Sequence, residues 1–332
     1  MPRRATRLGT QATLAREDAR MADLSSGPGT PVAAVKRTRR LWGSESSVSA
    51  LPWLAPALAL IVGVVIFPAG YMIYNSFRAI SKSGVDRGWA GWDNYASMLD
   101  IGALGRVLIN TAAWVTVVVA VTLVISIALA LFLNQRFPGR TAVRLALIVP
   151  WAASVVMTST VFVYGLNRYY GIINQALVDV GLLSEPAGFL ETAVPAFASA
   201  VAVAIFVSIP FTTFVVLAGL QTVPAETVEA AHIDGAGLVS TFWKIVLPML
   251  RPAIAVATIV NIINVFNSLP ILYAMTDPIP GYDADTTTTL MFKIIQRERE
   301  LDVASAISVL NFVIVLAVIV VYLRVTRPMR EV

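Results

Sequence analysis

The chain has 332 residues, of which 57% are hydrophobic and 14% are charged, with a mean hydropathy of +0.74. Soluble domains carry about 25% charged residues, so this composition is typical of a membrane protein. The absence of cysteine excludes a disulfide framework and a thiolate metal site. A net charge of +5 would suit nucleic-acid binding, unless the basic residues are distributed for another reason.

Charged residues divide the chain into six long charge-free windows, the shortest of 21 residues. A transmembrane helix needs about 20 apolar residues, so each window can hold one. The sequence therefore predicts an all-α polytopic membrane protein with six transmembrane helices. We expect these helices at about 51–76, 107–133, 142–166, 194–221 (broken by Pro210), 252–269 and from 303 to the last window's end at 323.

The predicted organisation is a tail at 1–47, a transmembrane domain at 48–326 and a short tail at 327–332. The first tail is rich in Arg, Ala, Ser, Gly and Thr without an apolar period, which predicts disorder. Its basic cluster at 36–40 lies just before the first apolar window. Such a cluster attracts anionic membrane lipid or simply anchors the topology.

The basic residues predict the orientation of the helices. Seventeen Lys and Arg residues lie in the two tails and in the loops at 136–144 and 226–251, against eight in the other three loops. Cytoplasmic segments carry the excess of Lys and Arg, so both termini and these two loops are expected in the cytoplasm. The positive charge is then explained by topology, and nucleic acid is not an expected partner.

The polar stretch 223–248 lies between two apolar windows. Pro224 suits the first turn of a helix, where its missing N–H is not needed. Gly235 suits the residue just after a helix, because glycine tolerates a positive φ. The stretch therefore predicts two short helices, at 227–234 and 238–246, with a glycine corner between them.

Within this stretch the residues follow the pattern E-A-A-x3-G-x9-I-x-L-P. The pattern resembles the cytoplasmic EAA loop of the permease subunits of ABC importers. The resemblance implies that the loop docks on a separate ABC ATPase subunit and couples ATP hydrolysis to transport. The coupling residues that it implies are Glu229, Ala230, Ala231, Asp234, Gly235, Ile245, Leu247 and Pro248.

Three further segments resemble the carbohydrate branch of these permeases, which is MalF- and UgpA-like. They are Trp89-x-Gly91-Trp92-x-Asn94-Tyr95, the run from Gly171 to Leu177, and the run from Pro210 to Pro224. Two positions depart from the branch: the loop at 277–281 lacks the usual glycine pair, and Asp302 stands where glycine is usual.

The resemblance implies which partners the protein has and where in the cell it is located. It implies a second homologous permease subunit, ABC ATPase subunits and an extracytoplasmic solute-binding lipoprotein. It also implies a multi-pass subunit of the cell membrane that forms half of a pathway for a carbohydrate substrate.

Polar residues on the fifth predicted helix suggest where a solute passes. Asn261, Asn264, Asn267 and Ser268 fall within about 120° of arc at about 100° per residue. Amides and hydroxyls can each donate to and accept from sugar hydroxyls, although amides also hold membrane helices together. The candidate pathway residues are Asn261, Asn264, Asn267, Ser268, Tyr164 and Asn311. Ser305, Ser308 and Asn311 form a second polar ridge on the sixth helix, where close packing is the alternative.

Several function classes are disfavoured by what the sequence lacks. It has neither G-x-x-x-x-G-K-[ST] nor G-x-G-x-x-G, so ATP hydrolysis is expected in a separate subunit and this chain is not expected to be an enzyme. Its single histidine, His232, excludes a His-based metal site or catalytic triad, and no cofactor or metal is expected. The charge-free windows disfavour an ion-driven secondary carrier, and no residue cluster suits a membrane enzyme. An organic phosphodiester such as a glycerol phosphate ester, or another polyol, stays open as the solute.

Overall fold

The computed structural model describes residues 51–326, and it divides the chain into two units, Met1–Val64 and Val65–Val332. The described part of the first unit is helical: it contains α2 (Leu51–Leu60) and the start of the π-helical turn η1 (Ile61–Ile66), which continues into the second unit. The predicted tails at 1–47 and 327–332, with the basic cluster at 36–40, lie outside the described residues.

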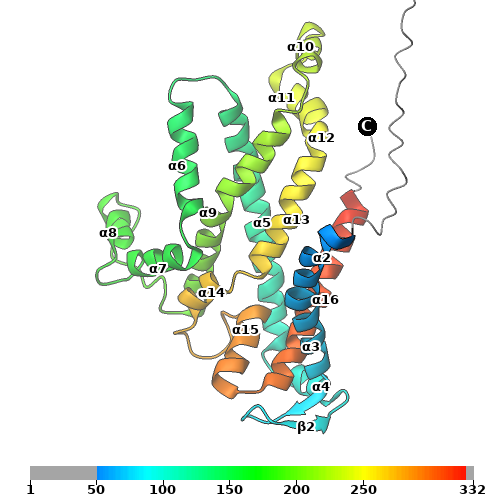
Figure 1. Cartoon of the computed structure of the whole chain (residues 1–332). Helices are drawn as coiled ribbons and strands as arrows, with labels where there is room; N and C mark the ends of the chain where they lie inside the picture. Colours follow the sequence, from blue (N-terminus) through cyan, green and yellow to red (C-terminus); the bar gives the residue numbers. More distant parts are fainter. Residues whose placement is uncertain (1–50, 327–332) are drawn as a thin grey trace, which may run out of the picture. The chain divides into compact units, whose positions relative to one another are not determined.

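The described part of the second unit is built from helices and one short antiparallel hairpin (Figure 1). Its longer helices are α5 (Leu104–Asn134), α9 (Ala193–Leu220), α13 (Arg251–Phe266) and α16 (Leu301–Thr326). Its shorter helices are α3 (Phe67–Asn75), α4 (Asp93–Leu99), α6 (Arg140–Ala152), α7 (Val155–Gly165), α8 (Ile172–Asp179), α10 (Ala225–Ile233), α11 (Leu238–Thr241), α12 (Leu247–Met249), α14 (Leu269–Thr276) and α15 (Thr287–Lys293). Two π-helical turns, η2 (Phe242–Val246) and η3 (Ile294–Glu298), and the strands β1 (Arg78–Ile80) and β2 (Asp86–Trp89) complete it.

Four described helices are long and apolar enough to cross a membrane alone, and two bent pairs bring the possible total to six. The four are Trp53–Asn75, α5, α9 and α16. The bent pairs are α6 with α7 and the segment Leu238–Met249 with α13. The fold is therefore all-α and polytopic, as predicted, apart from the two short strands.

The third predicted span, at 142–166, is not one continuous helix. The chain turns by 95° between α6 and α7, where Ala153 and Ser154 have extended backbone. Pro150 lies in the last turn of α6, where its missing N–H weakens the helix just before the break. The predicted window therefore holds a bent pair of helices instead of one straight helix, because apolar composition carries no information about a bend.

Pro210, in contrast to Pro150, does not lie at a break in its helix. It lies inside α9, which continues without interruption from Ala193 to Leu220, so the predicted break is absent. Pro210 is buried, and the neighbouring helix α5 places the Ser126 hydroxyl 3.2 Å from the Ile209 carbonyl that it donates to. Packing against neighbouring helices lets a membrane helix tolerate proline.

Helices α5, α9, α13 and α14 enclose the main hydrophobic core of the second unit. Trp114 and Val118 of α5, Val203 of α9, Val265 of α13 and Leu272 of α14 are all nearly fully buried within it. A second cluster joins α4 and the start of α5 to α15 and α16. Figure 1 shows α10 and α11 at one end of these helices and α4, α15 and the hairpin at the other.

Candidate functional site

The polar stretch 223–248 folds as a helix, a glycine corner and a second helix. The first helix, α10, begins at Ala225, so Pro224 is its N-cap rather than part of its first turn. Gly235 has a φ of +80°, which L side chains rarely adopt, and this confirms the predicted corner. Ala236 N–H donates to the Ala231 carbonyl and Gly235 N–H to the His232 carbonyl, which is the Schellman arrangement that ends many helices.

The predicted coupling residues divide between surface and interior. Glu229, Ala230, Asp234 and Gly235 are exposed, Ala231 is buried, and Ile245, Leu247 and Pro248 are half-buried. The second helix extends beyond the predicted 238–246 through η2 and α12 to Met249, where the chain bends by 67° into α13.

Apolar side chains are exposed beside the glycine corner. Ile233 is 86% exposed, Leu238 78%, Val239 73% and Trp243 62%. These four residues, here called the apolar corner, lie near the exposed polar residues Glu229 and Asp234. Large apolar side chains exposed among polar residues are typical of a protein-binding site.

A cavity of about 470 Å³ lies beside the end of α13. Four predicted pathway residues line it together: Asn261, Asn264, Asn267 and Ser268. The remaining lining is Trp151, Val155, Ala204, Val207, Ser208, Phe211, Val260, Val265, Pro270 and Ile271, none of which is charged. Because α13 ends at Phe266, Asn267 and Ser268 lie in the short break before α14.

The three asparagines differ in what their side chains bind. Asn261 is buried, and its Nδ2 donates to Thr212 Oγ1 at 2.7 Å and to the Ala257 carbonyl at 2.9 Å, which ties α13 to α9. Asn267 Nδ2 donates to the Ile263 carbonyl at 2.9 Å, within its own helix end. Asn264 is exposed, and its side chain has no hydrogen-bond partner within residues 51–326.

Tyr164 and Asn311 do not line this cavity. Tyr164 of α7 is 60% exposed and packs against Tyr170, with ring centroids 6.4 Å apart. Asn311 is half-buried on α16, and its Oδ1 has no hydrogen-bond partner in the described part of the chain. In the second polar ridge, Ser305 and Ser308 donate to carbonyls of their own helix.

The cavity lining also includes residues that the sequence did not predict, among them Trp151, Ser208 and Phe211. Trp151 follows Pro150 and lies close to the bend that ends α6, so the bend brings it to the cavity. The sequence signal that could have pointed to Trp151 is the Pro-Trp pair within an apolar window. Ser208 and Phe211 flank Pro210, and nothing in the apolar pattern distinguishes them.

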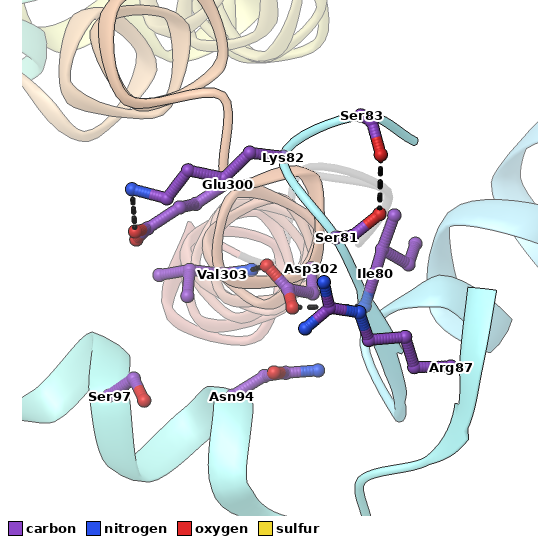
Figure 2. Close-up of a pocket in the computed structure, with 10 residues that line it drawn as sticks. All are labelled: Ile80, Ser81, Lys82, Ser83, Arg87, Asn94, Ser97, Glu300, Asp302 and Val303. Atoms are coloured by element: carbon purple, nitrogen blue, oxygen red, sulfur yellow. Dashed lines mark hydrogen bonds and ion pairs between the residues drawn. The ribbon is translucent and has the colours of Figure 1, made fainter. Parts of the chain in front are cut away.

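A second cavity, of about 690 Å³, lies between the hairpin, α4 and the start of α16 (Figure 2). Asp302 Oδ2 accepts the Ile80 N–H at 3.1 Å, and Lys82 pairs with Glu300 at 3.0 Å. Asp302 therefore ties the hairpin to α16. This contact explains a carboxylate at the position where the resembling permeases usually have glycine.

The segment 277–298, here called the outer segment after the orientation expected from the sequence, is fixed by buried and half-buried polar contacts. Lys293 Nζ lies 2.8 Å from Asp285 Oδ2 with both side chains buried, and it also donates to the Gly281 carbonyl. Burial raises the pKa of the Asp285 carboxyl, and the Lys293 ammonium opposes that rise. Tyr282 donates to Glu298, which raises the pKa of Tyr282 to about 12.

The family is decided by a match to a known sequence profile. The profile described as "Binding-protein-dependent transport system inner membrane component" matches residues 122–327, more than half of the chain. The chain belongs to this family. The permease is thus a non-catalytic, multi-pass inner-membrane subunit of a binding-protein-dependent ABC importer.

Two related proteins align with this permease over most of its length. It is 30% identical over 278 residues to the trehalose/maltose transport system permease protein MalF of Thermococcus litoralis, over 84% of this chain and 93% of that protein. It is 27% identical over 291 residues to the sn-glycerol-3-phosphate transport system permease protein UgpA of Yersinia pestis, over 86% and 97%.

A solved structure matches the fold. It is a bacterial alginate ABC transporter in complex with an alginate pentasaccharide-bound periplasmic protein. The TM-score is 0.73, the alignment covers 86% of this chain and 97% of the matched chain, and the two chains are 20% identical. At this identity the likeness establishes the fold.

Proposed function

We propose that the permease forms half of the membrane pathway for a carbohydrate, and that the solute contacts Asn264, Asn267 and Ser268. The observation that carries this proposal is the cavity beside the end of α13. It combines a few amide and hydroxyl groups with aromatic and aliphatic walls. Small-molecule sites commonly have this composition, because apolar walls exclude water and a few polar groups fix orientation.

The lining of the cavity, which contains no charged residue, favours a neutral solute. No Lys, Arg or His is among the residues that line it. An anionic phosphate is usually bound by Arg or Lys, so a phosphodiester would need its cation from the second permease. A carbohydrate is therefore the first candidate, and a glycerol-phosphate ester, for which the relative UgpA is named, is the second.

The other subunits are inferred from the two ends of the second unit. We infer that the apolar corner, with Glu229 and Gly235, docks on an ABC ATPase subunit. This surface is exposed, contains apolar side chains and lies at the end of the helices remote from the hairpin. We infer that the solute-binding protein approaches the opposite end, and that a homologous permease completes the pathway.

The test replaces Asn264 and Asn267 by alanine, singly and together. A lost hydrogen bond to a neutral hydroxyl costs about 0.5–1.5 kcal/mol, so each single variant should lower uptake roughly twofold to tenfold. The double variant should lower it further and change the preference among maltose, trehalose and sn-glycerol 3-phosphate. Uptake is measured in proteoliposomes of the complete transporter, per folded complex.

Asn261→Ala is the matched control, because its amide ties α13 to α9. We expect it to lower the melting temperature of the permease, whereas the Asn264 and Asn267 variants should leave that temperature nearly unchanged. Normal uptake per folded complex and an unchanged solute preference in the double variant would show that these asparagines do not contact the solute.

A further inference from the structure

At the end of α13, no backbone N–H of residues 51–326 donates to the Phe266 carbonyl, and the Val265 carbonyl accepts only one backbone N–H, that of Ser268, at 3.2 Å. In a continuous helix, the Phe266 carbonyl would accept the N–H of the residue four positions later. That residue is Pro270, which has no N–H. The chain instead breaks at Asn267 and Ser268, and Leu269 N–H donates to the Asn267 carbonyl. Buried carbonyls at a helix end need other donors.

Two side chains from other helices donate to these carbonyls. Trp114 Nε1, from α5, donates to the Val265 carbonyl at 2.8 Å. Thr288 Oγ1, from α15, donates to the Phe266 carbonyl at 3.0 Å. Trp114 and Thr288 are 1% and 8% exposed, so water does not compete freely for either contact. Neither residue lines the cavity.

We propose that Trp114 and Thr288 are positioning residues that hold the break between α13 and α14, so that Asn267 and Ser268 face the cavity. These two donors are here called the clamp. The inference rests on the proposed function, because it gives the clamp a role in solute recognition. The two donors hold the last two carbonyls of α13 from two different elements. A displacement of the break would move the amide and hydroxyl groups that follow it directly.

Both donors of the clamp are held by α5. Trp114 belongs to α5, and the start of α15 is bound to the same helix, since Thr287 N–H donates to Thr111 Oγ1 at 2.9 Å. Asn110 Nδ2 also donates to the carbonyls of Asp283 and Asp285. One rigid helix therefore fixes both donors relative to each other.

Contacts within the outer segment fix α15 further. At its first turn the Thr286 N–H donates to Thr289 Oγ1 at 2.9 Å, a contact that satisfies one free N–H group at the helix start. The buried Asp285–Lys293 pair spans the helix from its N-terminal side to its last residue. The outer segment thereby sets where Thr288 lies and, through it, the geometry of the cavity.

Thr288→Val tests the clamp, because valine keeps the shape of threonine and removes its hydroxyl. We expect faster amide hydrogen exchange at residues 267–269, whose N–H groups bond at this break, by roughly threefold to tenfold, as expected for one lost hydrogen bond. Maltose and trehalose uptake by the complete transporter should show a KM raised several-fold or an altered preference between the sugars, with a nearly unchanged maximal rate. Trp114→Phe should act in the same direction.

Thr276→Val is the matched control. Thr276 is also fully buried, but its hydroxyl donates to the Leu272 carbonyl of its own helix. This variant should leave both exchange at 267–269 and the KM unchanged. Unchanged exchange in Thr288→Val, or an equal change in Thr276→Val, would overturn the clamp.

The exchange measurement needs no solute, so it separates the clamp from the proposed pathway. Faster exchange with normal KM and preference would show that the clamp holds the break but has no role in recognition, which contradicts the inference. If the double alanine variant of Asn264 and Asn267 also transports normally, the proposed function fails together with it. If only that variant affects uptake, the pathway stands and the inference fails.

Discussion

Single residues of the same type serve different purposes in this permease. Asn94 Nδ2 donates to the carbonyls of Ser76 and Arg78, and Asn174 binds both the N–H and the carbonyl of Ala187, so both amides hold loops in place. Asn264 is exposed to the cavity and has no partner within residues 51–326. Burial, rather than residue type, separates the structural asparagines from the candidate solute contacts Asn264 and Asn267, which are both exposed.

Lys293→Met should destabilise the permease. The change removes the ammonium beside Asp285 and leaves a buried carboxylate without its cation, which typically costs about 3–5 kcal/mol. The pKa of Asp285, already raised from its ordinary 3.8 by burial, should rise further. A raised carboxyl pKa gives stability that is present at low pH and lost as the pH rises through the folded-state value. The variant should therefore melt much earlier than wild type at neutral pH, with a smaller difference in acid.

Arg106→Met is the control for this measurement, because Arg106 and Asp283 form an ion pair in which both side chains are 65% exposed. Exposed pairs contribute about 0–1 kcal/mol, so its melting temperature should stay close to that of wild type. A pH-independent difference between Lys293→Met and wild type would contradict the role given to the Asp285 carboxyl.

At the scale of elements, the breaks in the helices build the site. The bend between α6 and α7 brings Trp151 and Val155 to the cavity, and the break after α13 brings Asn267 and Ser268 there. Proline contributes at both places, as Pro150 and Pro270, whereas Pro210 interrupts nothing. The surroundings of a proline therefore decide whether its helix ends.

Gly235→Val tests whether the stretch 223–248 docks on the ATPase, as proposed. No atom lies within 4 Å of a Cβ added at Gly235, so the effect comes from its φ of +80° alone. A β-branched residue in this left-handed conformation costs about 1 kcal/mol or more. We expect weaker association with the ATPase and reduced ATPase stimulation, measured by co-purification and phosphate release, with unchanged affinity of the binding protein for its solute.

Gly237→Val provides the contrast, since Gly237 has an ordinary φ of −70° and open space around its Cα. It should leave coupling intact, and Gly235→Asn should recover part of the loss, because asparagine tolerates the left-handed region. Full coupling in Gly235→Val would argue against the docking assignment.

For the whole molecule, the expected orientation follows from the distribution of basic residues. The stretch 223–248, here called the coupling loop after its proposed role, and the outer segment lie at opposite ends of the helices of the second unit (Figure 1). Asp283 and Gly237 are exposed at these two ends, and the chain has no native cysteine. In intact cells, the variant Asp283→Cys should react with an impermeant thiol reagent, and Gly237→Cys should not.

Both variants should react after the cells are permeabilised, which shows that each thiol is accessible. The reverse labelling pattern in intact cells would place the coupling loop outside the cytoplasm and contradict the proposed docking to the ATPase.

The sequence by itself determined the membrane class, the approximate positions of the spans and the glycine corner at Gly235. Apolar windows and Gly235 act locally, through the length of a bilayer-spanning helix and the backbone freedom of one residue. Tertiary structure decided the 95° bend between α6 and α7, the continuity of α9 through Pro210 and the lining of the cavity. It also decided the donation from Trp114 and Thr288 to α13. These features depend on contacts between segments far apart in the chain, which no local pattern records.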